Sequence, residues 1–144
     1  MLSLFLRWLH VVAAIIWIGG MLFIALVLVP ITRRLEDRTL RVHLVQTVGV
    51  RFRVVGWIAL GVLLATGLAN VWLNPALLDR PRFLWKLVLV LLALALSAIH
   101  DFDLGPRAGA PGADPSLRIQ ASWIARINTL VVLVIVLLGL SLVR

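Results

Sequence analysis

Residues 4–29 read LFLRWLHVVAAIIWIGGMLFIALVLV, and this stretch decides the fold. A membrane-spanning helix needs about 20 mostly apolar residues. Within the stretch, Arg7 and His10 are the ionisable residues. The run is too long for the apolar core of a cleavable signal and lacks a clear small-residue cleavage site, so we expect it to form a membrane span.

Three further apolar runs follow, at residues 54–73, 83–100 and 119–143. Each is long and rich in Leu and Ala, which favours helices over buried strands. The sequence therefore predicts an all-α integral membrane protein, a four-transmembrane-helix up-down bundle that forms a single membrane domain over residues 1–144. No internal repeat stands out.

The composition excludes several classes of protein. Of 144 residues, 62% are apolar and 14% are charged, and the mean hydropathy is +1.10. Soluble domains are roughly half apolar and a quarter charged, and a small chain cannot bury so much apolar surface within itself. We therefore exclude a water-soluble enzyme, a nucleic-acid binder and a disordered tail, and expect a lipid bilayer as partner. With no Cys, the chain has no disulfide, thiolate metal site or thiol redox centre.

The connections between the predicted spans differ in character. Residues 31–53 place apolar residues among charges, which predicts either an amphipathic helix at the membrane interface or an extension of the second span. Residues 74–82 form a short connection. Residues 101–118 contain three Gly and three Pro, which predicts a flexible loop.

The distribution of cationic residues predicts the orientation. One membrane side holds both termini and the second connection, and it carries Arg7, Arg80, Arg82, Lys86 and Arg144. The other side carries Arg33, Arg34, Arg38, Arg41, Arg51, Arg53, Arg107, Arg118 and Arg126. Because cytoplasmic loops are enriched in Lys and Arg, we expect a multi-pass protein of the cell inner (cytoplasmic) membrane with both termini outside.

Polar residues inside the spans are the candidate site residues, because burying them in lipid is costly. His10 in the first span and Lys86 in the third are predicted to lie at one depth, where the second span contributes Asn70. The alternative is a lysine that reaches the headgroups and a hydrogen-bonded histidine with no ligand.

Two helix faces continue from these residues. One face of the first span collects His10, Ala13, Ala14, Trp17, Gly20 and Met21, and one face of the third collects Lys86, Val90, Ala93, Ser97 and His100. Small residues on such faces indicate either close helix packing or a cleft for a flat cofactor.

A further polar cluster follows the third span. His100, Asp101 and Asp103 could bind a divalent cation or could simply be solvated at the interface. The carboxylates are predicted to lie at a helix C-terminus, where the dipole disfavours anions. We expect Arg51, Arg53 or Arg126 to compensate them, and we expect His43 to be solvated at the interface.

The chain resembles two families of small membrane proteins. His10, Trp17, Gly19, Gly20 and Pro30, then Arg51-Phe52-Arg53, Gly56-Trp57 and Thr66-Gly67-Leu68, then Lys86-Leu87 and His100-Asp101-Phe102, resemble the first three helices of the CopD copper-resistance membrane domain. A His seven residues before a Trp, with the later Lys-Leu and His, is also similar to the HemJ-type protoporphyrinogen oxidase. That second resemblance implies haem b binding, with His10 and Lys86 functionally important.

Three functions follow as hypotheses. The first is a membrane haem-binding redox protein that acts in electron transfer or as a porphyrin-linked oxidoreductase. In it His10 ligates the iron, Lys86 pairs with a propionate or porphyrin carboxylate in a catalytic role, and Trp17, Asn70 and His100 contribute to cofactor binding. The second is a copper transport or copper-resistance protein with His10, Met21 and His100 as metal stations. The third is a cofactor-free structural or assembly subunit. A homo-oligomer and a redox or metal-delivery partner are compatible with all three, and no nucleic-acid partner is expected.

Overall fold

The computed structural model describes residues 1–110 and 112–141. In that part of the chain, four helical stretches are long and apolar enough to cross a membrane. They comprise Leu2–Arg33, Arg38–Leu73, Pro81–Gly109 and Pro115–Ser141. This confirms the all-α fold with four candidate spans. The last residues of the predicted fourth span, Leu142 and Val143, and the counted cation Arg144 lie outside the described residues, as does Pro111.

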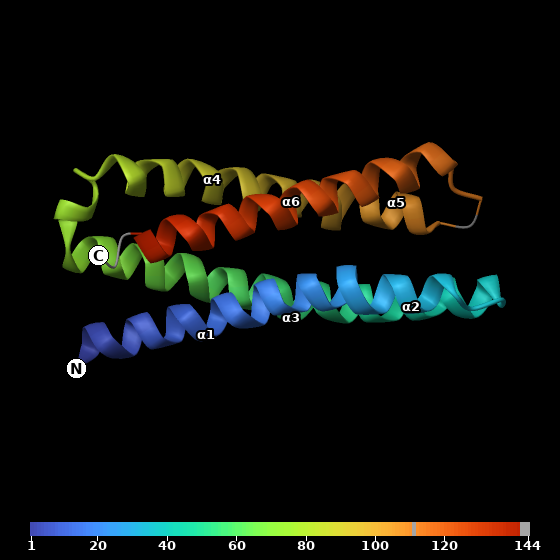
Figure 1. Ribbon diagram of the computed structural model, residues 1–144, viewed down its shortest axis with the longest axis horizontal. Helices are drawn as coiled ribbons and strands as arrows, with labels where there is room; N and C mark the ends of the chain where they lie inside the picture. Colours follow the sequence, from blue (N-terminus) through green and yellow to red (C-terminus); the bar gives the residue numbers. More distant parts are fainter. Residues whose placement is uncertain (111, 142–144) are drawn as a thin grey trace. The chain divides into compact units, whose positions relative to one another are not determined.

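The chain divides into two compact units, Met1–Asp79 and Arg80–Arg144, which we term the first and second hairpins. In the first hairpin, helix α1 (Leu2–Phe23) packs along helix α3 (Arg38–Leu73). In the second, helix α4 (Pro81–Ala98) packs along helix α6 (Pro115–Ser141). Figure 1 shows the paired helices of each hairpin side by side.

The first connection is mostly an extension of the second span. Helix α3 runs unbroken from Arg38 to Leu73 over 36 residues, so the predicted connection 31–53 holds no separate interfacial helix. Asp37 begins the helix because its carboxylate accepts hydrogen bonds from the backbone N–H groups of Thr39 (2.8 Å) and Leu40 (3.1 Å). Of the two alternatives for this connection, the extension is confirmed.

Two prolines lie inside helices, although Pro30 was expected to end the first span and Pro106 to lie in the third connection. Pro30 follows a π-helical segment, η1 (Ile24–Leu28), and belongs to the short helix α2 (Val29–Arg33). Pro106 follows the π-helical segment η3 (Ile99–Leu104) and belongs to the short helix α5 (Gly105–Gly109). A proline ring clashes with the carbonyl four residues earlier and lacks an N–H, and the wider π turn accommodates both defects.

The predicted loop 101–118 is therefore wrong over its first half, because helix continues to Gly109. Asp101 and Asp103 consequently lie within a helix and not at its C-terminus. The second connection is short as predicted, with one 3-10 turn, η2 (Pro75–Leu77), before Pro81 begins α4.

Small residues allow the helices of the first hairpin to approach closely. A Cβ atom at Gly20 would overlap the ring of Phe52 on α3. A Cβ atom at Gly56 would lie 3.6 Å from both the Phe52 ring and Trp17 Cδ1. The small residues of this face therefore serve close packing at this level, as in other membrane helix pairs.

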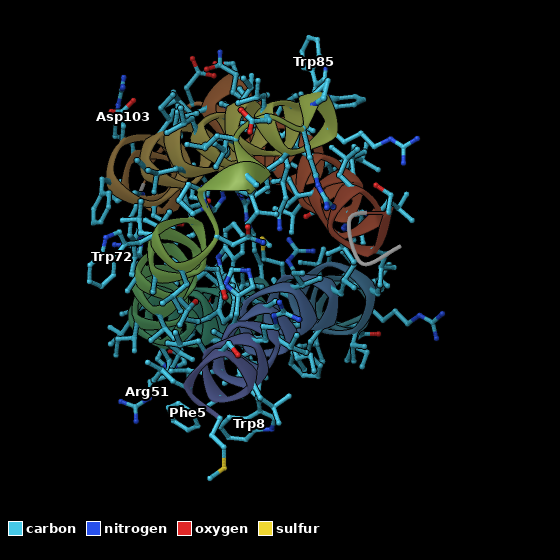
Figure 2. The ribbon with its side chains drawn as sticks, turned by 90° about the vertical axis from the view of Figure 1, so that its left-hand side faces the viewer. Phe5, Trp8, Arg51, Trp72, Trp85 and Asp103 are labelled. Carbon is cyan, nitrogen blue, oxygen red and sulfur yellow. The ribbon has the colours of Figure 1, made fainter. Side chains whose placement is uncertain are left out.

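The outward faces of the helices are apolar and aromatic. Trp8 and Trp85, near the starts of α1 and α4, are 58% and 66% exposed, and Figure 2 shows both pointing outward from their own helices. Phe5 stacks on Trp8 with ring centroids 6.0 Å apart. Exposed aromatic side chains near helix ends suit the boundary between lipid and water.

Candidate functional site

His10 forms the central polar contact of the first hairpin. Its Nδ1 lies 2.7 Å from the hydroxyl oxygen of Thr66 on α3. That hydroxyl also lies 2.7 Å from the carbonyl oxygen of Val62, which can only accept. Because a hydroxyl has one hydrogen, Thr66 donates to Val62 and accepts from His10 Nδ1–H. In its neutral form the His10 ring therefore carries its hydrogen on Nδ1 and a lone pair on Nε2.

The surroundings of His10 are half buried and small. A Cβ atom at Gly67 would lie 3.8 Å from His10 Cε1, so the glycine leaves room beside the ring. Thr66 is 4% exposed. The fixed Nδ1–H with a lone pair on Nε2 is the arrangement seen in histidines that bind a metal through Nε2.

Two other predicted site residues lie on the same two helices. Asn70 is half buried one turn beyond Thr66 on α3, at the end of the helix that also holds His10's partner. Trp17 is buried about two turns from His10, against Gly56. The structure thus places Trp17 in helix packing, and a role of either residue in binding stays a prediction.

Lys86 lies on the half-buried face of α4 in the second hairpin. Its Nζ is 3.6 Å from the position that a Cβ atom would take at Gly139 on α6. The side chain therefore runs along α6 where that helix has no side chain of its own. Lys86 and His100 are 14 residues apart on one helical stretch, which is roughly 20 Å at 1.5 Å per residue. The two side chains therefore do not belong to one binding site.

A buried hydrogen bond that sequence reasoning missed joins α4 and α6. The side-chain amide of Asn128 donates to the hydroxyl of Ser97 at 2.9 Å, and both residues are buried. Ser97 had been placed on the α4 face, but Asn128 had not been considered. The signal was an amide inside the predicted fourth span, which in a membrane helix indicates an interhelical bond.

The acidic cluster around His100 pairs locally. His100 Nδ1 lies 2.9 Å from Asp101 Oδ1. Asp103, which Figure 2 shows pointing outward, accepts from Arg107 one turn later at 3.0 Å. Arg107 thus compensates Asp103, whereas the expectation had named Arg51, Arg53 and Arg126. Arg126 instead lies over the Trp123 ring, 5.4 Å from its centroid.

No group of three or more His, Cys, Asp or Glu side chains gathers as a metal cage within residues 1–110 and 112–141. His100, Asp101 and Asp103 therefore do not form the three-ligand cation site considered from the sequence. His43 is exposed on the extension of α3, where solvation was expected. The single histidines His10 and His100 remain the candidate ligands.

Two comparisons with known proteins found matches that cover most of the chain. The sequence profile of a family described as "Copper resistance protein D" matches residues 46–142. A protein of Aquifex aeolicus (strain VF5) described as "Uncharacterized protein" is 35% identical over 140 residues, covering 96% of this chain and 93% of that protein. No solved structure matches.

Proposed function

The chain belongs to the copper resistance protein D (CopD) family of integral membrane proteins, and on that premise we propose that it handles copper, with His10 as a copper ligand in the first hairpin. Copper is the substrate in this proposal and not a resident cofactor. The observation that carries it is the hydrogen-bond chain from His10 Nδ1–H through Thr66 to the Val62 carbonyl.

The chemistry of that chain supports metal binding. A neutral imidazole nitrogen is a competent copper ligand. An acceptor on the other ring nitrogen fixes the tautomer and raises the basicity of the ligating nitrogen. In the first hairpin the acceptor is the Thr66 hydroxyl, whose own hydrogen is engaged by Val62, so the ring cannot exchange tautomers without losing a bond.

The other residues that we propose as copper ligands lie far from His10. Met21 follows it by eleven residues on the same helix, about 16 Å at 1.5 Å per residue. His100 in the second hairpin offers a second imidazole, tied through Nδ1 to Asp101. We propose single-residue stations along a path and not one multidentate cage.

Metal analysis of detergent-purified protein tests the proposal. The native chain is expected to bind copper, and His10→Ala is expected to bind less of it. The matched control is His43→Ala, which removes an exposed imidazole from the α3 extension. Equal copper in the native chain and in His10→Ala would contradict the role of His10.

Haem b is the second candidate, and the same tautomer favours it because an axial imidazole also binds through Nε2. In the first hairpin, Met21 lies about 16 Å from His10 along the helix, so it cannot ligate the same iron. His10 is therefore the residue that would hold the haem iron, and a bound haem would supply one-electron redox chemistry. An absorption spectrum, oxidised and dithionite-reduced, separates the candidates: a Soret band that His10→Ala removes supports haem, and its absence from native protein removes haem from consideration.

A further inference from the structure

We propose that the chain is a tandem repeat of one helical hairpin, and that Lys86 occupies in the second copy the place that His10 occupies in the first. The repeat follows from the structure and the sequence alone. The role of Lys86 as a site residue rests on the proposed function of His10.

The order of backbone elements is the same in both hairpins. A long α-helix changes into a π-helical segment that ends at Leu28 in the first hairpin and at Leu104 in the second. A proline follows two residues later, inside a helix of five residues in each case. A turn and a second long helix complete each hairpin.

Side-chain exposure follows the same register. Pro106 lies 76 residues after Pro30, and this offset also relates the exposed positions of the first helices. The exposed residues Val11, Ile15, Ile16, Gly19, Phe23, Leu26, Val27 and Pro30 correspond to the exposed residues Leu87, Leu91, Leu92, Ala95, Ile99, Phe102, Asp103 and Pro106. Two pairs in this stretch differ, because Ala25 is exposed where Asp101 is half buried and Val12 is half buried where Val88 is exposed. The exposed fractions agree most closely in the middle of the helices, with Ile15 at 65% and Leu91 at 64%, and Ile16 and Leu92 both at 44%, whereas Val11 at 54% and Leu87 at 37% differ.

The start of each second helix carries one sequence motif. Residues 37–42 read DRTLRV, and residues 114–119 read DPSLRI. The leading aspartate has the same role in both, because Asp37 accepts from the Thr39 N–H at 2.8 Å and Asp114 accepts from the Ser116 N–H at 2.8 Å. The motif lies 77 residues apart in the two hairpins, one more than the prolines, because the second turn is one residue longer.

Two apolar-faced helices can match in phase by chance, since both repeat every 3.6 residues. Here the match continues through a π-helical segment, which rotates the later positions relative to the earlier ones. The motif after the turn is a separate observation that helical phase does not generate. Together these observations favour repetition over coincidence.

The 76-residue offset relates His10 to Lys86. Both are half buried, and each lies against a glycine of the second helix of its own hairpin. The position of a Cβ atom at Gly67 is 3.8 Å from His10 Cε1, and that at Gly139, which the 77-residue offset aligns with Val62 and not with Gly67, is 3.6 Å from Lys86 Nζ. The repeat thus places an imidazole in the first copy and an ammonium group in the second at equivalent positions of the first helices, each facing the second helix of its own hairpin.

Exchange of the two side chains tests the equivalence. His10→Lys alone is expected to lose the copper that His10 binds, and the double variant His10→Lys/Lys86→His is expected to regain part of it, because the imidazole returns at the equivalent position without the Thr66 acceptor. The control His10→Lys/Val88→His puts an imidazole at nearly the same level on the outward face of α4 and is expected to stay without that copper. Equal copper in both double variants would overturn the role of Lys86.

Depth measurement tests the repeat without any metal. Single cysteines at Ile16, Leu92 and Ala95 in this Cys-free chain carry nitroxide labels on outward faces. The repeat pairs Ile16 with Leu92, whereas alignment by the first residues of α1 and α4 pairs Ile16 with Ala95, about 4.5 Å further along the helix. Equal bilayer depth of Ile16 and Leu92 supports the repeat, and equal depth of Ile16 and Ala95 overturns it. If the native chain binds no copper, the proposed function fails while this result still decides on the repeat.

Discussion

The Thr66 hydroxyl decides which nitrogen of His10 can ligate. Thr66→Val keeps the shape of the side chain but removes the acceptor of His10 Nδ1–H. Because changes to such outer partners typically cost 10–100-fold in metal affinity, we expect copper affinity to fall by about that factor. A copper titration measures it.

Thr32→Val is the matched control for this change. Thr32 is also buried in the first hairpin and also donates to a carbonyl of its own helix, Val29 at 3.1 Å. Its replacement is expected to leave copper affinity unchanged. Equal losses in the two variants would mean that Thr66 acts through packing alone.

The cap at Asp114 gives a pH dependence outside the spans. Hydrogen bonds from the Ser116 backbone N–H and side chain hold the pKa of Asp114 below its usual value of 3.8. Because the folded pKa is lowered, the stabilisation is complete above the usual value and is lost as the pH falls through the lowered one. Asp114→Asn keeps a capping side chain that does not titrate.

Thermal unfolding of both proteins in detergent checks this expectation. The midpoint of the native chain relative to Asp114→Asn is expected to fall as the pH decreases from 6 to 3. A constant difference over this range would show that ionised Asp114 does not stabilise the start of α6.

At the residue scale, the sequence predicts the polar positions but not their partners. His10 and Lys86 stand out because ionisable groups are costly in lipid. The partner of His10 is 56 residues away, and the partner of Ser97 is 31 residues away. Such pairs depend on the level at which two helices pack, which composition and spacing do not determine.

Among the elements, the contact of α1 with α3 depends on a missing side chain. Gly20→Ala would place a methyl group where the Phe52 ring lies, so the ring has to move. Overpacking of this kind costs about 1–3 kcal/mol. We expect the free energy of unfolding to fall by that amount, as measured by denaturation in detergent.

Gly19→Ala is the control, because nothing lies within 4 Å of its Cβ position. It is expected to leave stability unchanged or slightly raised. The double variant Gly20→Ala/Phe52→Leu is expected to recover part of the loss. A Gly20→Ala protein as stable as Gly19→Ala would contradict the close approach.

Helix boundaries were the weakest part of the sequence prediction. Proline and glycine usually indicate turns, and that rule predicted a loop from residue 101. In the structure, Pro30 and Pro106 follow π-helical segments that let the helix continue. Neither segment has a signal in hydropathy, because the change concerns backbone hydrogen bonds and not side-chain polarity.

For the whole molecule, the predicted orientation remains open to a direct test. The nine cationic residues on one membrane side against five on the other predict that the turn after α5 is cytoplasmic. A single cysteine at Ala110 is expected to resist an impermeant maleimide added to intact cells, and one at Ala76 is expected to react. The reverse labelling pattern would invert the orientation.

The sequence predicted the four spans but not the similarity between the two hairpins that they form. Length and hydropathy predict spans because the bilayer requires them. The similarity of the hairpins is hidden, because most positions in both need only be apolar and many residues satisfy that need. The proline after each π-helical segment and the capping motif after each turn, where Asp37 and Asp114 bond the backbone, keep a recognisable identity.

The unbroken course of α3 has a consequence for the membrane around it. At about 1.5 Å per residue its 36 residues extend about 54 Å, well beyond a hydrocarbon layer about 30 Å thick. Because no proline interrupts it, a mismatch with the bilayer is met by tilting the whole rod and not by bending it. The bond from His10 to Thr66 makes α1 share that tilt, so the angle of the first hairpin should increase as the surrounding lipid becomes thinner.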